Sequence, residues 1–169
     1  MPKQIIKGEE LRNKLKIGVN TVADITKSTL GPRGRNVLLA RHGQTPVITK
    51  DGKTTNAELE LEDPVENLGG QLVREASAKS EEQAGDGTTT VTVLTQAIVE
   101  EGFKLVAAST PPLPLKAGLD RACKAVVDYL KTVSEEVKED DLEKIASISA
   151  NSKEYGQIIA DAIKKVGKL

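Results

Sequence analysis

Apolar residues recur every three or four positions along most of this 169-residue chain, as they do on one face of an α-helix. The same spacing predicts helices over residues 64–83, 88–105, 115–133, 142–148 and 153–166, after a first helix over 9–29. In that first helix the apolar positions are Leu11, Leu15, Val19, Val22 and Ile25. We therefore expect a mainly α fold.

Short apolar runs between these helices favour β-strands. Residues 36–40 and 46–49 are typical of two strands of a hairpin, and residues 4–7 also have the composition of a short strand. Residues 50–53 follow the hairpin as a tight loop. Residues 88–95 alternate threonine and valine, which also suits a strand, but the helical spacing continues beyond them, so we favour a helix there.

Turn and capping residues mark several helix ends. Gly31 and Pro32 end the first helix, because glycine suits the C-terminal cap and proline cannot continue the helix. Asp63 predicts the start of the third helical segment, with Pro64 at its first position. The pair Gly69–Gly70 inside that helix should cost about 1 kcal/mol for each glycine relative to alanine. That cost is offset if another backbone packs closely against the pair.

The composition excludes several classes of protein. The chain has 24 basic and 25 acidic residues and 2% aromatic residues, which argues against a surface that binds nucleic acid. No apolar run approaches the roughly 20 residues that span a bilayer, so we expect no membrane partner and a cytoplasmic protein. Cys123 is the only cysteine and His42 the only histidine. We interpret Cys123 as a small core residue and His42 as a solvated residue of the hairpin turn.

Residues 84–90 carry the strongest sign of chemistry. Gly85 and Gly87 flank Asp86, and three threonines then open a predicted helix. Glycines let the backbone approach an anion, and free N–H groups at a helix N-terminus bind phosphate. An acid in such a loop indicates an intervening cation, and Mg²⁺ prefers one or two carboxylates together with phosphate oxygens. The alternative is a glycine-rich turn in which aspartate and threonine cap the helix.

Other nucleotide motifs are absent. Gly52, Lys53 and Thr54 match the end of a P-loop, but Val47 stands where the leading glycine would be needed. A dinucleotide fingerprint requires its glycine-rich turn directly after a strand, whereas residues 85–87 follow a predicted helix. Asp51 and Asp86 could share a metal phosphoryl site, one on the cation and one on an attacking water. The alternative for Asp51 and Gly52 is an ordinary turn.

Four segments together resemble group I chaperonins of the Hsp60 type. They are residues 29–37 (TLGPRGRNV), 48–52 (ITKDG), 84–90 (AGDGTTT) and 148–152 (ISANS), and they occur in the family's order and near its spacing. The resemblance covers essentially the whole chain. It implies a helical chaperonin equatorial-domain fold with a small β-hairpin stem loop at residues 37–49, and an ATPase that folds captive polypeptides.

The resemblance also implies roles for individual residues. Asp86 would bind Mg²⁺ and Asp51 would position or activate the attacking water as the catalytic residue. Main-chain oxygens of Thr29 and Lys50 would face a K⁺ ion. The residues expected to bind the nucleotide are Thr29, Leu30, Gly31, Pro32, Lys50, Asp86, Gly87, Thr88, Thr89 and Thr90.

The same resemblance predicts the domains and partners. Residues 1–134 would form the N-terminal part of the equatorial ATP-binding domain, and residues 135–169 would begin the intermediate domain. We expect homo-oligomeric rings, unfolded client proteins and a co-chaperonin for the intact protein.

The chain also departs from the family's pattern. Family members are several times longer, and the apical domain and the C-terminal return to the equatorial domain lie outside this sequence. Residues 134–136 (SEE) replace a common proline at the junction between the domains. Residues 53–56 (KTTN) are more polar than is usual after the Lys-Asp-Gly loop. The alternative function is therefore a stand-alone, chaperonin-like helical interaction module without ATP turnover.

Overall fold

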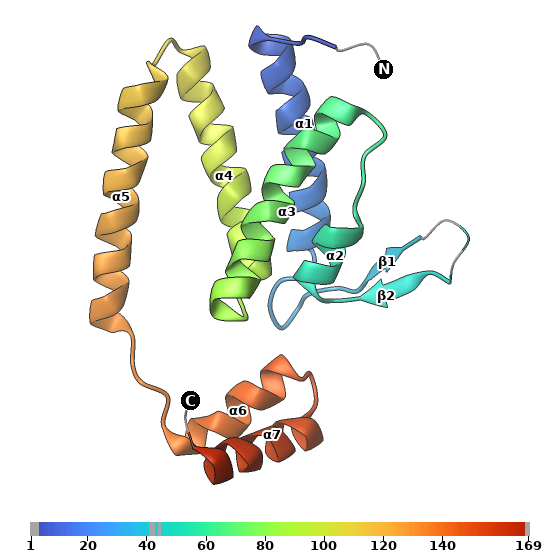
Figure 1. Cartoon of the computed structure of the whole chain (residues 1–169), viewed down its shortest axis with the longest axis vertical. Helices are drawn as coiled ribbons and strands as arrows, with labels where there is room; N and C mark the ends of the chain where they lie inside the picture. Colours follow the sequence, from blue (N-terminus) through green and yellow to red (C-terminus); the bar gives the residue numbers. More distant parts are fainter. Residues whose placement is uncertain (1–3, 41–42, 44, 168–169) are drawn as a thin grey trace. The chain divides into compact units, whose positions relative to one another are not determined.

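The computed structural model describes residues 4–40, 43 and 45–167 (Figure 1). Over these residues the chain forms seven α-helices and one two-stranded antiparallel sheet, which confirms the prediction of a mainly α fold. The elements are α1 (Gly8–Lys27), β1 (Val37–Leu39), β2 (Val47–Thr49), α2 (Gly52–Glu58), α3 (Pro64–Ala84), α4 (Thr88–Ala107), α5 (Pro112–Val133), α6 (Glu139–Ser149) and α7 (Lys153–Val166).

Two local predictions are wrong. Residues 4–7 do not form a strand, because within the described residues the only sheet pairs β1 with β2. The tight loop expected at residues 50–53 instead opens helix α2, where the Asp51 side chain accepts a hydrogen bond from the Thr54 N–H at 2.7 Å. An aspartate at this position caps a helix as readily as it forms a turn.

The chain divides into two compact units, Met1–Lys116 and Ala117–Leu169. In the first unit α1, α3 and α4 pack against one another, and α2 lies against all three (Figure 1). The centre of this core is formed by Val19, Val22 and Val73, which are fully buried. The centre of this core is therefore built from small β-branched side chains, in a chain with only 2% aromatic residues.

Glycines bring α1 and α3 into direct backbone contact. A Cβ atom at Gly69 would lie 2.2 Å from the Leu15 carbonyl oxygen, and one at Gly18 would lie 1.7 Å from that of Glu66. No larger residue fits at either position without moving a helix. The condition under which the cost of the Gly69–Gly70 pair is offset is therefore met at Gly69, whereas an added Cβ at Gly70 would meet the side chains of Val22 and Arg74.

The hairpin pairs β1 and β2 in an antiparallel register, with Leu38 opposite Ile48. Both of these side chains are exposed, while Leu39 is buried. The predicted antiparallel pairing of the two strands is confirmed by this register. His42, expected to be a solvated turn residue, lies outside the described residues.

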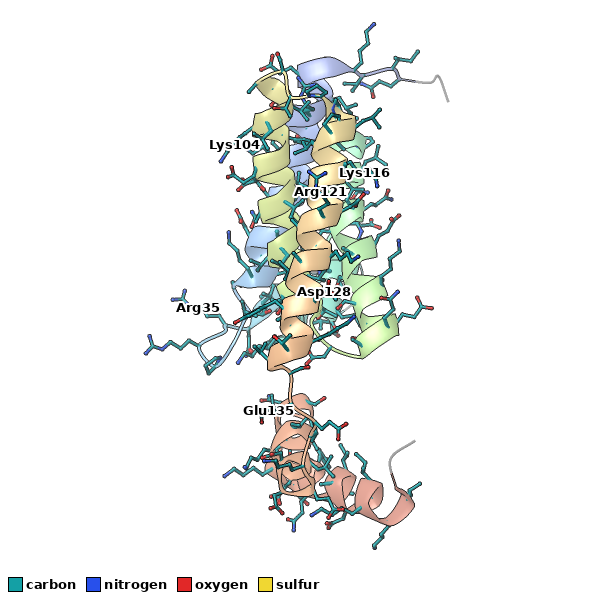
Figure 2. All side chains as sticks on the ribbon, turned by 90° about the vertical axis from the view of Figure 1, so that its left-hand side faces the viewer. Arg35, Lys104, Lys116, Arg121, Asp128 and Glu135 are labelled. Carbon is teal, nitrogen blue, oxygen red and sulfur yellow. The ribbon has the colours of Figure 1, made fainter. Side chains whose placement is uncertain are left out.

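The second unit contains most of α5 together with the pair α6 and α7. Ala146 and Ala160 are buried between α6 and α7, and Gly156 faces Ser147 so closely that a Cβ atom there would lie 2.5 Å from the Ser147 Cα. No residue of α5 is buried, and charged side chains such as Arg121 and Asp128 lie along it (Figure 2).

Two further expectations concern this unit. Cys123 is exposed on α5, so its interpretation as a core residue is wrong: the apolar spacing of α5 indicated a buried face that the helix does not have here. The boundary between the two compact units lies within α5, between Lys116 and Ala117. The boundary predicted at residue 134 is of a different kind, because it separates two domains of a chaperonin. No helix in the described part of the chain is long and apolar enough to cross a bilayer.

Candidate functional site

The loop before α2 and the first turn of α4 meet at Gly52. A Cβ atom at Gly52 would lie 2.2 Å from the Thr89 hydroxyl oxygen and 3.2 Å from that of Thr88. Only a residue without a side chain allows this approach. The structure thus joins two of the three predicted loops, although about 35 residues separate them in the sequence.

The third predicted loop, after α1, meets the segment after β2 at Gly34. A Cβ atom at Gly34 would lie 2.0 Å from the Thr29 carbonyl oxygen and 2.9 Å from the Lys50 side chain. Two backbone hydrogen bonds fold this loop back on itself: the N–H of Gly34 donates to Gly31 at 3.0 Å and the N–H of Arg35 donates to Ser28 at 2.8 Å. Thr29 and Lys50 are therefore neighbours, and Leu30, Gly31 and Pro32 form the exposed turn beside them.

Left-handed glycines shape the loop between α3 and α4. Gly85 and Gly87 have φ angles of 67° and 82°, a conformation that residues with a side chain rarely adopt. Asp86 stands between them and is exposed. The carboxylate of Asp86 accepts a hydrogen bond from the Gly87 N–H at 2.6 Å, and the Ser80 hydroxyl donates to the Asp86 carbonyl at 2.8 Å.

Helix α4 begins directly after this loop. Its N-cap residue Gly87 has no side chain, so no cap occupies the free N–H groups of the first turn. Thr88 is buried, Thr89 is half-buried and Thr90 is exposed. This end of α4 therefore combines free N–H donors, threonine hydroxyls and the positive end of the helix dipole, which favours an anion such as phosphate.

Asp51 is held in one orientation by α2. One of its carboxylate oxygens, Oδ2, accepts hydrogen bonds from both the N–H and the hydroxyl of Thr54, each at 2.7 Å. The N–H of Asp51 in turn donates to the Thr49 hydroxyl at 3.0 Å. With Oδ2 engaged in this way, Oδ1 is the oxygen that can face a ligand or a water molecule.

Metal binding at this site would have to use phosphate oxygens as partners. Within the described residues no group of three or more histidine, cysteine or acidic side chains gathers to hold a metal ion. Mg²⁺ bound to nucleotides needs only one or two carboxylates, the remaining ligands being phosphate oxygens and water. A single exposed carboxylate at Asp86, next to a helix N-terminus that favours anions, fits that donor set.

Sequence reasoning missed the polar residues beneath the loops. The side chains of Thr26, Asn56 and Thr92 are buried and joined by hydrogen bonds. They come from α1, α2 and α4, the three helices that carry the predicted loops. The polar composition of residues 53–56 was the signal in the sequence, but without the fold it did not indicate what Asn56 contacts.

Comparisons with known proteins agree with this architecture. The model of the TCP-1/cpn60 chaperonin family matches residues 22–168. Among solved structures, the chain is similar to the chaperonin gp146 from the bacteriophage EL 2 (Pseudomonas aeruginosa), whose crystal structure was determined in the presence of ATP-BeFx. The TM-score is 0.77 at 26% sequence identity, over 93% of this chain. The chain spans 28% of the length of that chaperonin.

Proposed function

The chain belongs to the TCP-1/cpn60 chaperonin family, and on that premise we propose that it supplies the phosphate-binding part of a Mg-ATP site in an ATP-dependent folding chaperonin. Its helices and small hairpin match the chaperonin equatorial-domain fold. The chaperonin gp146 was crystallised with a nucleotide analogue, which supports a nucleotide as the ligand of the corresponding loops here.

One observation carries the proposal: the close approach of Gly52 to the hydroxyls of Thr88 and Thr89. This contact gathers a carboxylate, a glycine-rich backbone and a helix N-terminus at one place. Each feature alone has a structural explanation as a turn or a cap. Their meeting in three dimensions favours a phosphate site over three unrelated turns.

In this site the residues 86–90 bind the phosphates. The N–H groups and hydroxyls of Thr88, Thr89 and Thr90 donate to phosphate oxygens. Asp86, oriented by its neighbour Gly87, provides one carboxylate as a ligand for Mg²⁺. The bound Mg²⁺ neutralises charge on the phosphates when it is present. The exposed turn formed by Leu30, Gly31 and Pro32 would contact the nucleotide.

Asp51 acts on the water that attacks the terminal phosphate. Thr54 holds one carboxylate oxygen, so the other is directed to accept a hydrogen bond from that water. The oriented water then adds to phosphorus as the bond to the leaving ADP oxygen breaks, and its proton passes to solvent or to phosphate. Carbonyl oxygens of Thr29 and Lys50 are the proposed K⁺ ligands, and their segments meet at Gly34.

The wider roles are proposals of the same kind. We assign residues 1–134 to an equatorial domain and residues 135–169 to the start of an intermediate domain. The intact protein would form homo-oligomeric rings in the cytoplasm, act on unfolded client proteins and work with a co-chaperonin.

Calorimetric titration of Mg-ATP into this chain tests the nucleotide site. We expect saturable binding that disappears when Mg²⁺ is removed by chelation and weakens at least about tenfold in Asp86→Ala, because one ligand of the cation is lost. Asp161→Ala, an acid on α7 in the second compact unit, is the matched control and should bind like the unmodified chain. Equal binding by Asp86→Ala and the unmodified chain would contradict the assignment of Asp86.

A further inference from the structure

A buried line of hydrogen bonds runs beneath the proposed nucleotide loops. The Thr26 hydroxyl donates to the Asn56 Oδ1 at 2.6 Å, and the Asn56 Nδ2 donates to the Thr92 hydroxyl at 2.8 Å. Thr26 and Thr92 are fully buried, and Asn56 is 1% exposed. One carboxamide thus joins α1 to α4 through the short helix α2.

The line continues at both ends into the loops themselves. The Thr92 hydroxyl donates to the Thr88 carbonyl at 2.8 Å, and Thr88 is the first residue of α4. At the other end the Thr29 hydroxyl donates to the Thr26 carbonyl at 2.8 Å. Asn56 therefore lies midway between residue 29 in the α1 loop and residue 88 in the α4 loop.

The direction of each bond fixes the orientation of the carboxamide. The single hydroxyl proton of Thr92 goes to the Thr88 carbonyl, so Thr92 can only accept from Asn56, and the amide nitrogen must face it. The amide oxygen then accepts from Thr26. A carboxylate or a hydrocarbon at position 56 cannot make both bonds.

Because these side chains are buried, their hydrogen bonds constrain where the side chains lie relative to one another. A buried donor or acceptor that loses its partner is costly, so Thr26 and Thr92 must keep their positions relative to Asn56. Asn56 also belongs to the same helix that Asp51 caps, so the catalytic carboxylate is tied to the same frame. All three loops are thereby connected to one buried side chain.

We propose that Asn56 is a positioning residue that couples the three nucleotide loops. It fixes the position of the loop after α1 relative to the loop before α4, so that the phosphate site is formed before the nucleotide binds. This inference rests on the proposed nucleotide function and names a residue that touches no ligand. Its effect reaches the site through Thr26 and Thr92.

Amide hydrogen exchange without nucleotide tests the coupling. The readouts are the Arg35 N–H, which donates to Ser28 in the α1 loop, and the Val91 N–H, which donates to Gly87 at the start of α4. Asn56→Ala should speed exchange of both amides by about tenfold, the equivalent of one lost hydrogen bond. Thr26→Val, which removes one hydroxyl on α1, should also speed exchange at Val91 on α4.

Val73→Ala is the matched control. It removes buried volume from the core of the same unit without removing a hydrogen bond of Thr26, Asn56 or Thr92, and should reduce stability by a comparable amount. Its effect on Arg35 and Val91 should follow the loss of global stability alone. Equal exchange rates in Asn56→Ala and Val73→Ala at matched stability, or a Thr26→Val effect confined to α1, would overturn the coupling.

Mg-ATP titration of the same variants separates this inference from the proposed function. We expect Asn56→Ala to bind about tenfold more weakly than the unmodified chain, and Val73→Ala to bind equally well. Unchanged affinity in Asn56→Ala would overturn the positioning role and leave the nucleotide function standing. An unmodified chain that does not bind Mg-ATP would overturn the function and, with it, this inference.

Discussion

Gly52 sets how closely two loops of the site approach each other. A Cβ atom at this position would lie 2.2 Å from the Thr89 hydroxyl oxygen and 3.2 Å from the Thr89 Cβ, so any side chain must displace the first turn of α4. The contact is between a backbone and a short, branched side chain. Such a group has little freedom to move aside.

Substituting Gly52→Ala should therefore weaken Mg-ATP binding by at least about tenfold, since the threonines no longer reach the same phosphate oxygens. Gly102→Ala is the control, because Gly102 lies within α4 and has no atom within 4 Å of an added Cβ. That variant should bind normally and gain about 0.5–1 kcal/mol in stability. Calorimetric titration measures the Mg-ATP affinity of both variants, and equal affinities of Gly52→Ala and Gly102→Ala would contradict the packing argument.

Sequence alone could identify residues of the site but not their contacts. Asp86 and the three threonines after it stood out because glycines, an acid and hydroxyls precede a helical pattern. Asn56 and Thr26 did not stand out, because each is an ordinary polar residue in its own segment. Their meaning depends on three helices meeting at one point, and no local pattern contains that information.

Among the elements, α3 shows how a helix start and an ion pair are combined. Asp63 accepts hydrogen bonds from the N–H groups of Val65 at 2.8 Å and Glu66 at 3.2 Å, as its capping role predicted, and Lys14 of α1 donates to the same carboxylate. The hydrogen bond from the Lys14 ammonium holds the pKa of Asp63 below its ordinary value of 3.8, and the hydrogen bond from the Glu66 N–H adds a smaller effect in the same direction. Desolvation acts in the opposite direction.

This lowered pKa predicts a dependence of stability on pH. The folded chain holds the Asp63 proton less tightly than the unfolded chain, so the contribution is present above the ordinary pKa of 3.8 and is lost as the pH falls through the lowered folded pKa. Asp63→Asn keeps the cap but does not titrate. Urea unfolding between about pH 5 and pH 2 should show that acidification lowers the free energy of unfolding less in Asp63→Asn than in the unmodified chain. Parallel curves of the free energy of unfolding against pH would contradict the assignment.

The helix pair α6 and α7 depends on a close approach at Gly156. A Cβ atom there would lie 2.1 Å from the Ser147 hydroxyl oxygen and 2.6 Å from the Ser147 backbone nitrogen, so a side chain must separate the helices. Gly156→Ala should destabilise the second unit by about 1–3 kcal/mol. Gly118→Ala on α5, where an added Cβ meets no atom within 4 Å, should not destabilise it.

Tyrosine fluorescence can follow this unfolding. The chain has two tyrosines and no tryptophan, and Tyr129 and Tyr155 both lie in the second unit. Urea titration followed at the tyrosine signal therefore reports on α5 and α7. Similar midpoints for Gly156→Ala and Gly118→Ala would contradict the close packing of α6 and α7.

The elements were predictable where the periodic pattern was long. Helices α1, α3, α4, α5 and α7 each span at least 14 residues and were expected within a few residues of their observed ends. Helix α2 has seven residues and three buried ones, Gly52, Thr55 and Asn56, none of which is a large apolar residue. Its position depends on tertiary hydrogen bonds, so hydrophobic spacing could not reveal it.

At the scale of the whole molecule, all of the proposed site residues lie in the first compact unit. That unit contains α1 to α4 and the hairpin, while α6 and α7 belong to the second. The chain belongs to the chaperonin family and spans 28% of the length of gp146. The segment before α2 meets the loop after α1 at Gly34 and the start of α4 at Gly52. The central claim is that these loops form one ligand site.

Backbone NMR during a Mg-ATP titration tests that claim most directly. We expect the amide signals of Gly31, Gly52 and Gly87 to shift together with a single dissociation constant, while those of α6 and α7 stay unchanged. Each of these glycines represents one loop, so a common titration curve means one site. Shifts confined to one loop, or different constants for different loops, would contradict the account.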